Sequence, residues 1–325
     1  MENNELNEEI VRLAYRLVLG RSSENQNAIQ SHIALRNIEN LRKTLINSAE
    51  FKDKFGVSYE SEECKDRVFV SYENEQFKIL HSKLSSKPIE TFIETKNDLL
   101  ILQTCDRENY LPMLQHTSLT VLAYIKRHGC NYETFIGLKR GVWPWHATFN
   151  RIYKLNDYIE SGYKGWVLYM DADAYFCNFD FDLLSYLSDK QKYAFVLAHT
   201  GITPNYYDIN AGVFFANLGH PVCVNIIRRW KGIYDRMYKD EDYARAIKWN
   251  MISNDQSSFV NIIRYNLYKS YLYIEGTGEI FNSGHAKVIR QILRKNYQDN
   301  CLDTLEQRTA TIASDVRKAL ATIVA

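Results

Sequence analysis

One apolar run that ends in two carboxylates constrains the fold of this 325-residue chain more than any other stretch. The five apolar residues 166–170 follow one another without interruption, and Asp171 and Asp173 come directly after them. Such a run predicts a strand that is buried on both faces, which is typical of a parallel sheet covered by helices. The aspartates would then leave the sheet at the carboxyl end of the strand, where such sheets bind their ligands.

Strand-like and helix-like stretches alternate along most of the chain. Short apolar runs predict strands at 98–104, 133–137, 166–170, 194–199, 212–216 and 271–275. Longer patterned stretches predict helices at 109–128, 147–161, 220–237, 253–265, 285–296 and 302–323. This alternation predicts an α/β domain with a mostly parallel sheet flanked by helices.

The N-terminal part has a purely helical pattern. Ile10, Leu13, Ala14 and Leu17 recur at the spacing of one helix face, and Gly20 predicts the end of that helix. The predicted organisation is a small helical domain at 1–57, a linker at 58–96, the α/β domain at 97–284 and a C-terminal helical extension at 285–325.

The spacing of Asp171 and Asp173 suits a cation site. In an extended segment, residues i and i+2 project to the same side, so the two carboxylates can converge on one point. Carboxylates that close repel each other unless a cation lies between them, and oxygen ligands suit Mg²⁺ or Mn²⁺. The alternative is turn or helix-cap chemistry, for which Asp is also favoured. The apolar strand before the motif favours a metal and phosphate site.

The stretch "YKGWVLYMDADAYF" resembles the strand and D-x-D element of GT-A-fold glycosyltransferases, closest to the retaining galactosyl-, xylosyl- and mannosyl-type families that use nucleotide sugars. Further stretches resemble elements of these families in the same order, over about 97–290: "LQTCDRENYLPMLQ", "HATFNRIYKLNDYI", "DINAGVFFANL", "SNDQSSF" and "IFNSGHAK".

The N-terminal segment has a resemblance of its own. It resembles a small bacterial helical domain of unknown function that often accompanies glycosyltransferases. The matching positions are Tyr15, Leu19, Gly20, Arg21, Ser48, Glu50 and Phe51.

The glycosyltransferase resemblance implies a role for each matching position. Base and ribose contacts would come from Gln103, Thr104, Asp106 and Tyr110, and further donor contacts from Arg151, Asp171, Ala211 and Gly212. The catalytic candidates at the sugar are Asn210, Asp255 and Gln256. The ligands of Mn²⁺ (or Mg²⁺) would be Asp171, Asp173 and His285.

Ordinary structural alternatives stay open for several of these positions. Asn210–Gly212 could be a strand entry, and Asp255 with Gln256 could be a helix N-terminus. Arg151 could be a surface arginine on an amphipathic helix, and His285 could be structural. Asp208 is a further carboxylate nearby in sequence and stays a candidate base.

The predicted reaction is transfer of a hexose from a nucleoside diphosphate sugar to a glycan, glycolipid or glycoprotein. A UDP-sugar is favoured and GDP-mannose is possible, and the resemblance implies that the anomeric configuration is retained. A sugar-phosphate nucleotidyltransferase is one alternative, but the glycine-rich basic loop typical of that class is missing after the first strand. A catalytically inactive carbohydrate-binding protein of the same fold is the other alternative.

Composition limits the partners and the location. The formal net charge of +1 argues against a nucleic-acid-binding protein. Six scattered cysteines, an acidic N-terminus and the lack of a long apolar run predict a cytoplasmic protein that is soluble or peripheral to the membrane. A basic amphipathic helix at 285–296 could lie on an anionic membrane or pack on the sheet.

Overall fold

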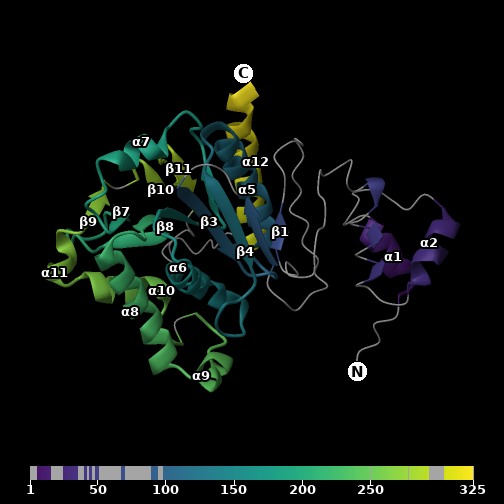
Figure 1. Cartoon of the computed structure of the whole chain (residues 1–325), viewed down its shortest axis with the longest axis horizontal. Helices are drawn as coiled ribbons and strands as arrows, with labels where there is room; N and C mark the ends of the chain where they lie inside the picture. The colour runs from purple at the N-terminus through teal and green to yellow at the C-terminus, as the bar shows by residue number, and fades with distance from the viewer. Residues whose placement is uncertain are drawn as a thin grey trace. The chain divides into compact units, whose positions relative to one another are not determined.

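The computed structural model describes most of the chain and divides it into two compact units, Met1–Thr91 and Phe92–Ala325 (Figure 1). The described residues are 6–15, 25–35, 40–41, 44–45, 48–50, 67–69, 89–93, 98–249, 251–276, 278–292 and 304–324. Each unit is described below by itself.

The described part of the first unit contains two short helices, α1 (Glu8–Ala14) and α2 (Gln26–Ile33), and the short strand β1 (Arg67–Phe69). An asparagine side chain caps the N-terminus of each helix. Their apolar faces share a small core formed by Leu6, Val11, Ala14, Tyr15, Ile29, Leu41 and Leu45. Of the N-terminal pattern, Leu17, Leu19, Gly20, Arg21 and Phe51 lie outside the described residues.

Starting at β2, the strands of the main sheet follow one another in the order β2-β4-β3-β5-β8-β7-β9. These strands are β2 (Ile89–Ile93), β3 (Leu99–Cys105), β4 (Asn131–Ile136), β5 (Trp166–Asp171), β7 (Phe195–His199), β8 (Ile209–Asn217) and β9 (Leu272–Glu275). β3 runs parallel to both β4 and β5, β8 runs antiparallel to β5 and β7, and β9 is again parallel to β7. All seven residues of β3 and the first five of β5 are buried, as their continuous apolar runs predict.

Two groups of helices cover the sheet on opposite sides (Figure 1). On one side α6 (Asn150–Glu160) packs on α8 (Pro221–Met237), and α8 packs on α10 (Asp255–Ile263). On the other side α5 (Leu111–His128) packs on α12 (Leu305–Val324). The shorter elements are the 3₁₀ helix η3 (Pro144–Phe149), α7 (Leu183–Ser188), α9 (Asp240–Arg245) and α11 (Asn266–Lys269). The α/β class and the mostly parallel, helix-flanked sheet are therefore confirmed.

A second, three-stranded sheet corrects one prediction. It has the order β10-β11-β6, with β6 (Ala174–Phe176), β10 (Phe281–Ser283) and β11 (Ile289–Gln291). The helix predicted at 285–296 is wrong over its described part, because β11 pairs with β6 immediately after the D-x-D motif. Ile289 and Gln291 are buried and Arg290 between them is partly exposed, as the alternation of a strand requires.

The predicted amphipathic helix for a membrane surface therefore has no basis in residues 285–292. Its remaining basic positions, Arg294 and Lys295, lie outside the described residues. Among the helices of the described part of the chain, none is long and apolar enough to cross a membrane.

Candidate active site

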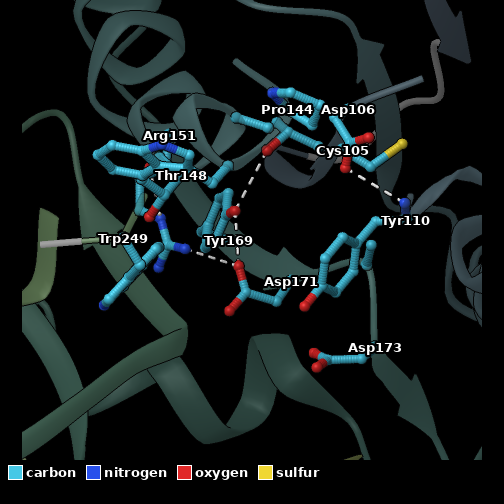
Figure 2. A pocket seen from close by; sticks show the side chains of 14 residues that line it. Cys105, Asp106, Tyr110, Pro144, Thr148, Arg151, Tyr169, Asp171, Asp173 and Trp249 are labelled. Atoms are coloured by element: carbon cyan, nitrogen blue, oxygen red, sulfur yellow. Dashed lines mark hydrogen bonds and ion pairs between the residues drawn. The ribbon is translucent and has the colours of Figure 1, made fainter. Parts of the chain in front are cut away.

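A cavity of about 270 Å³ opens at the carboxyl ends of β3 and β5 (Figure 2). Its wall comes from the β3 end, the start of α5, η3, α6, the β5 end and Trp249. The lining residues with polar groups or large rings are Thr104, Asp106, Tyr110, Trp145, Thr148, Arg151, Tyr169, Asp171, Asp173 and Trp249. Segments that are far apart in the sequence therefore meet where parallel strands end, the usual ligand-binding edge of such sheets.

Arg151, on the first turn of α6, joins the end of β5 to two segments outside the cavity wall, β8 and the start of α10. Its Nη2 lies 2.7 Å from Asp171 Oδ1, and its Nε lies 3.1 Å from Asp255 Oδ2. Its Nη1 donates to the carbonyl of Ala211, and the guanidinium lies over the ring of Tyr169, 4.5 Å from its centroid. Only 6% of the Arg151 side chain is exposed, so it is a buried group with two carboxylate partners and not a surface arginine.

Asp171 is held by several donors at once. Tyr169 donates its hydroxyl to Asp171 Oδ1 at 2.8 Å, and Gln291 donates its amide to Oδ2 at 3.2 Å. Burial raises the pKa of the Asp171 carboxyl; the Arg151 guanidinium opposes this effect, and the Asp173 carboxylate adds to it. The neighbouring Asp173 carboxylate thus makes ionisation of Asp171 less favourable, and the hydrogen bonds to Asp171 offset part of this effect.

Asp173 has a guanidinium partner of its own. Arg308 Nη2, from the first turn of α12, lies 2.7 Å from Asp173 Oδ2. Gln291 Nε2 lies 2.9 Å from Asp173 Oδ1, so one amide bridges both aspartates. Arg308 also donates to the Tyr110 hydroxyl at 3.3 Å.

The Asn-Ala-Gly and Asp-Gln motifs meet behind Arg151. The backbone N–H of Ala211 donates to Gln256 Oε1 at 3.1 Å, and Thr148 donates its hydroxyl to Asp255. Asn210 accepts from the N–H of Gly212 at 2.9 Å. Asp255 is the first residue of α10, as the helix N-terminus alternative predicts, and its carboxylate forms an ion pair with Arg151.

The loop after β3 is organised by Asp106. Its carboxylate accepts from the backbone N–H groups of Glu108 and Asn109 at 2.8 and 2.5 Å and from that of Tyr110 at 3.2 Å. Gln103, three residues earlier in β3, is fully buried. Its amide donates to Thr117 and to the carbonyls of Asp171 and Ala174, and accepts from the Tyr132 hydroxyl. Because this amide is fully engaged inside the protein, we leave Gln103 out of the proposed donor contacts.

Two predicted site residues lie elsewhere. Asp208 ends the exposed 200–208 loop and accepts from the N–H of Thr203 at 2.6 Å. His285 is exposed in the turn after β10, with its own N–H bonded to Ser283 Oγ at 3.2 Å. Neither residue lines the cavity or contacts Arg151, whereas Ala211 and Asp255, which do not line the cavity either, bond Arg151 directly.

The arrangement around Asp171 and Asp173 does not fit a divalent metal. Each of the four carboxylate oxygens already accepts a hydrogen bond. The donors are Arg151 and Gln291 for Asp171, and Gln291 and Arg308 for Asp173. No group of three His, Cys, Asp or Glu residues that could hold a metal ion occurs in the part of the chain that the structure describes. A cation at Asp173 Oδ2 would therefore have to displace the buried guanidinium of Arg308.

Sequence reasoning missed Gln291 and Arg308, the two partners of the aspartates that come from the C-terminal segment. Arg308 did leave a signal, because it lies one helical turn before Ile312 and two before Val316, which are both buried on α12. A charged residue within an apolar stripe is expected to have a buried partner.

Comparison with known proteins leaves the family open. No protein-family model and no curated protein matches the chain. Among solved structures, a glycosyltransferase involved in glycosylation of the major capsid of PBCV-1 has a TM-score of 0.46 and 16% identity, over 66% of this chain and 98% of that one. The glycosyltransferase GlyE of Streptococcus pneumoniae TIGR4 has a TM-score of 0.40 and 14% identity, over 69% and 64%.

A Drosophila galactosyltransferase 7 mutant, crystallised with manganese, UDP-Gal and xylobiose, is similar at a TM-score of 0.33 and 15% identity, over 65% of this chain and 79% of that one. At these scores the likeness adds no argument about the site, so the proposal below rests on the residues of this chain.

Proposed function

We propose that this protein is a glycosyltransferase that takes a hexose from a nucleoside diphosphate sugar, with a UDP-sugar favoured over GDP-mannose. One observation carries the proposal: Arg151 joins Asp171 of the D-x-D motif, the Asn-Ala-Gly segment and the Asp-Gln motif beside a single cavity. These are the same segments on which the sequence resembles GT-A glycosyltransferases.

The nucleoside would bind at the β3 side of the cavity. Thr104, Asp106 and Tyr110 line it there and offer hydroxyl, carboxylate and ring groups for a base and a ribose. The diphosphate would then lie near Arg151, whose fixed positive charge attracts phosphate oxygens. Because charge builds on the departing diphosphate, a fixed cation at this point stabilises the transition state.

The sugar would lie toward Asp255 and Gln256, on the α10 side of Arg151. Their polar groups could stabilise the positive charge that develops on the sugar ring as the anomeric bond breaks. The resemblance implies retention of configuration, in which the departing diphosphate accepts the proton of the acceptor hydroxyl. This proposal needs no base at Asp208, which lies outside the cavity.

The acceptor would enter past two tryptophans. Trp145 and Trp249 both line the cavity, with ring centroids 5.5 Å apart, and Trp249 is 48% exposed. Indole faces stack on the apolar faces of sugars, which suits a glycan acceptor.

A nucleotide-release assay tests the proposal. UDP- and GDP-sugars are offered to the full chain with and without oligosaccharide acceptors, and product anomers are identified by NMR. We expect turnover of at least one donor, a loss of about 100-fold or more in Asp255→Asn, which pairs with Arg151, and little change in Asp208→Asn, a carboxylate that bonds within the 200–208 loop instead.

Equal turnover in the two variants would contradict the assignment of the site. Release of pyrophosphate from a nucleoside triphosphate and a sugar 1-phosphate would instead identify a nucleotidyltransferase.

A further inference from the structure

The contact between Arg308 and Asp173 places a fixed positive charge where the sequence pattern predicts a metal ion. Arg308 Nη2 lies 2.7 Å from Asp173 Oδ2, and the side chains of the two residues are 4% and 10% exposed. The partners of this pair are 135 residues apart in the sequence, so the contact comes from the tertiary fold.

The surroundings of Arg308 hold it in this position. Its Nη2 also donates to the carbonyl of Ile292 at 3.1 Å, and its guanidinium lies 5.8 Å from the centre of the Tyr110 ring. On the same helix Ile312 and Val316 pack in a buried cluster with Met113 and Tyr175. The helix that carries Arg308 is therefore anchored on α5 and β6 and is not a loose lid.

Each of three carboxylates in this group has an arginine partner. Arg151 pairs with Asp171 and Asp255, and Arg308 pairs with Asp173, so two guanidiniums face three carboxylates. Without a counter-charge, the carboxylate of Asp173 would repel a diphosphate bound beside it. A divalent cation at Asp173 would, in turn, be repelled by the guanidinium already there.

We propose that Arg308 replaces the metal ion at the D-x-D motif, so that the chain binds its diphosphate-containing donor without a divalent cation. Arg308 acts through Asp173 and Tyr110, which line the cavity, and is a positioning residue; Arg151 is the cation that can touch the phosphates. The identity of the donor in this inference rests on the proposed function. The prediction about metal binding does not.

Titration with Mn²⁺ alone, followed by electron paramagnetic resonance, tests the inference on the full chain. We expect the wild type to bind Mn²⁺ only weakly, and Arg308→Gln to bind it at least about tenfold more tightly, because the substitution removes the positive charge beside Asp173 and frees its Oδ2 for a cation. Arg317→Gln, an exposed arginine on the same helix, is the matched control and should behave as the wild type does.

Tight, stoichiometric binding of Mn²⁺ by the wild type that is lost in Asp173→Asn would overturn the inference. This outcome is read on the wild type, so the test stands even where Arg308→Gln fails to fold. Circular dichroism of each variant shows whether it is folded.

Donor turnover in the presence of a chelator gives a second measurement. Wild-type activity should be unchanged by EDTA within about twofold, whereas Arg308→Gln should become dependent on added Mn²⁺. Complete loss of wild-type activity in EDTA with recovery by Mn²⁺ would refute the replacement of the metal. Should no donor be turned over under any condition, the proposed function fails, and the Mn²⁺ titration still decides the role of Arg308.

Discussion

Two classes of arginine in this chain differ in what their ion pairs contribute. Arg151 is buried between Asp171 and Asp255, whereas Arg228 meets Glu160 at 3.2 Å with both side chains more than half exposed. Exposed pairs contribute little because water screens them, but breaking a buried pair leaves a desolvated charge without a partner.

The substitution Arg151→Lys tests this difference. Lysine cannot donate to Asp171, Asp255 and the Ala211 carbonyl at once, so we expect a loss of about 3 kcal/mol in the free energy of unfolding. Arg228→Lys, the matched change in an exposed pair, should stay within about 0.5 kcal/mol of the wild type. Urea unfolding measures both, and equal losses would show that Arg151 is not the buried centre described above.

Single residues also show where sequence reasoning ended. Asp171, Arg151 and Asp255 were singled out from motifs, and the structure brings their charged groups together. Asn210, also singled out, reaches Asp171 only through Gln291. Gln291 was not, although its amide bridges both aspartates and packs where a side chain on Gly212 would collide with it. No local pattern marks Gln291, because its role exists only once β11 has paired with β6.

Among elements, continuous apolar runs gave the most reliable predictions. β3, β5 and β7 lie within one residue of the runs that predicted them, because a strand buried on both faces has no polar positions to confuse the pattern. β11 was mistaken for a helix because three residues are too few to show a period, and their pairing partner lies more than a hundred residues earlier.

The 3₁₀ helix η3, which forms one wall of the cavity, is built around a neutral histidine. His146 is buried, and its Nδ1 accepts from the backbone N–H groups of Val142 and Trp143 at 2.9 and 3.1 Å. Gly141 has a φ of 87°, and a Cβ there would collide with the imidazole. Burial lowers the pKa of His146 to about 4, because the charged form of the ring loses its hydration there.

This histidine predicts how stability depends on pH. Its folded pKa is below its unfolded value of about 6.5, so the unfolded chain binds the proton first and stability falls as the pH drops from about 6.5 to 4. We expect a loss of about 1–3 kcal/mol over this window that is absent in His146→Asn, whose amide oxygen can accept the same hydrogen bonds. Thermal unfolding at several pH values measures it, with the exposed His285→Asn as control; parallel curves for the wild type and His146→Asn would argue against it.

At the scale of the whole molecule, the site belongs entirely to the second unit. The residues that line the cavity fall between Thr104 and Trp249, and the groups that hold them extend to Arg308. The α/β class followed from the sequence, because it depends on patterns of a few residues. The closure of the site by β11 and α12 did not, because it depends on packing between the C-terminal segment and the D-x-D region.

Removal of the N-terminal helical segment tests this separation. A chain that starts at residue 57 keeps every cavity-lining residue and the buried core around α6, α8 and α10, so we expect donor turnover within about twofold of the full chain. Removal of residues 304–325 should abolish turnover instead, because it deletes Arg308 and exposes the apolar cluster around Met113 and Tyr175. Steady-state nucleotide release and circular dichroism on the two truncated chains measure these outcomes. A folded chain that lacks residues 1–56 but has lost turnover would place part of the function in the first unit.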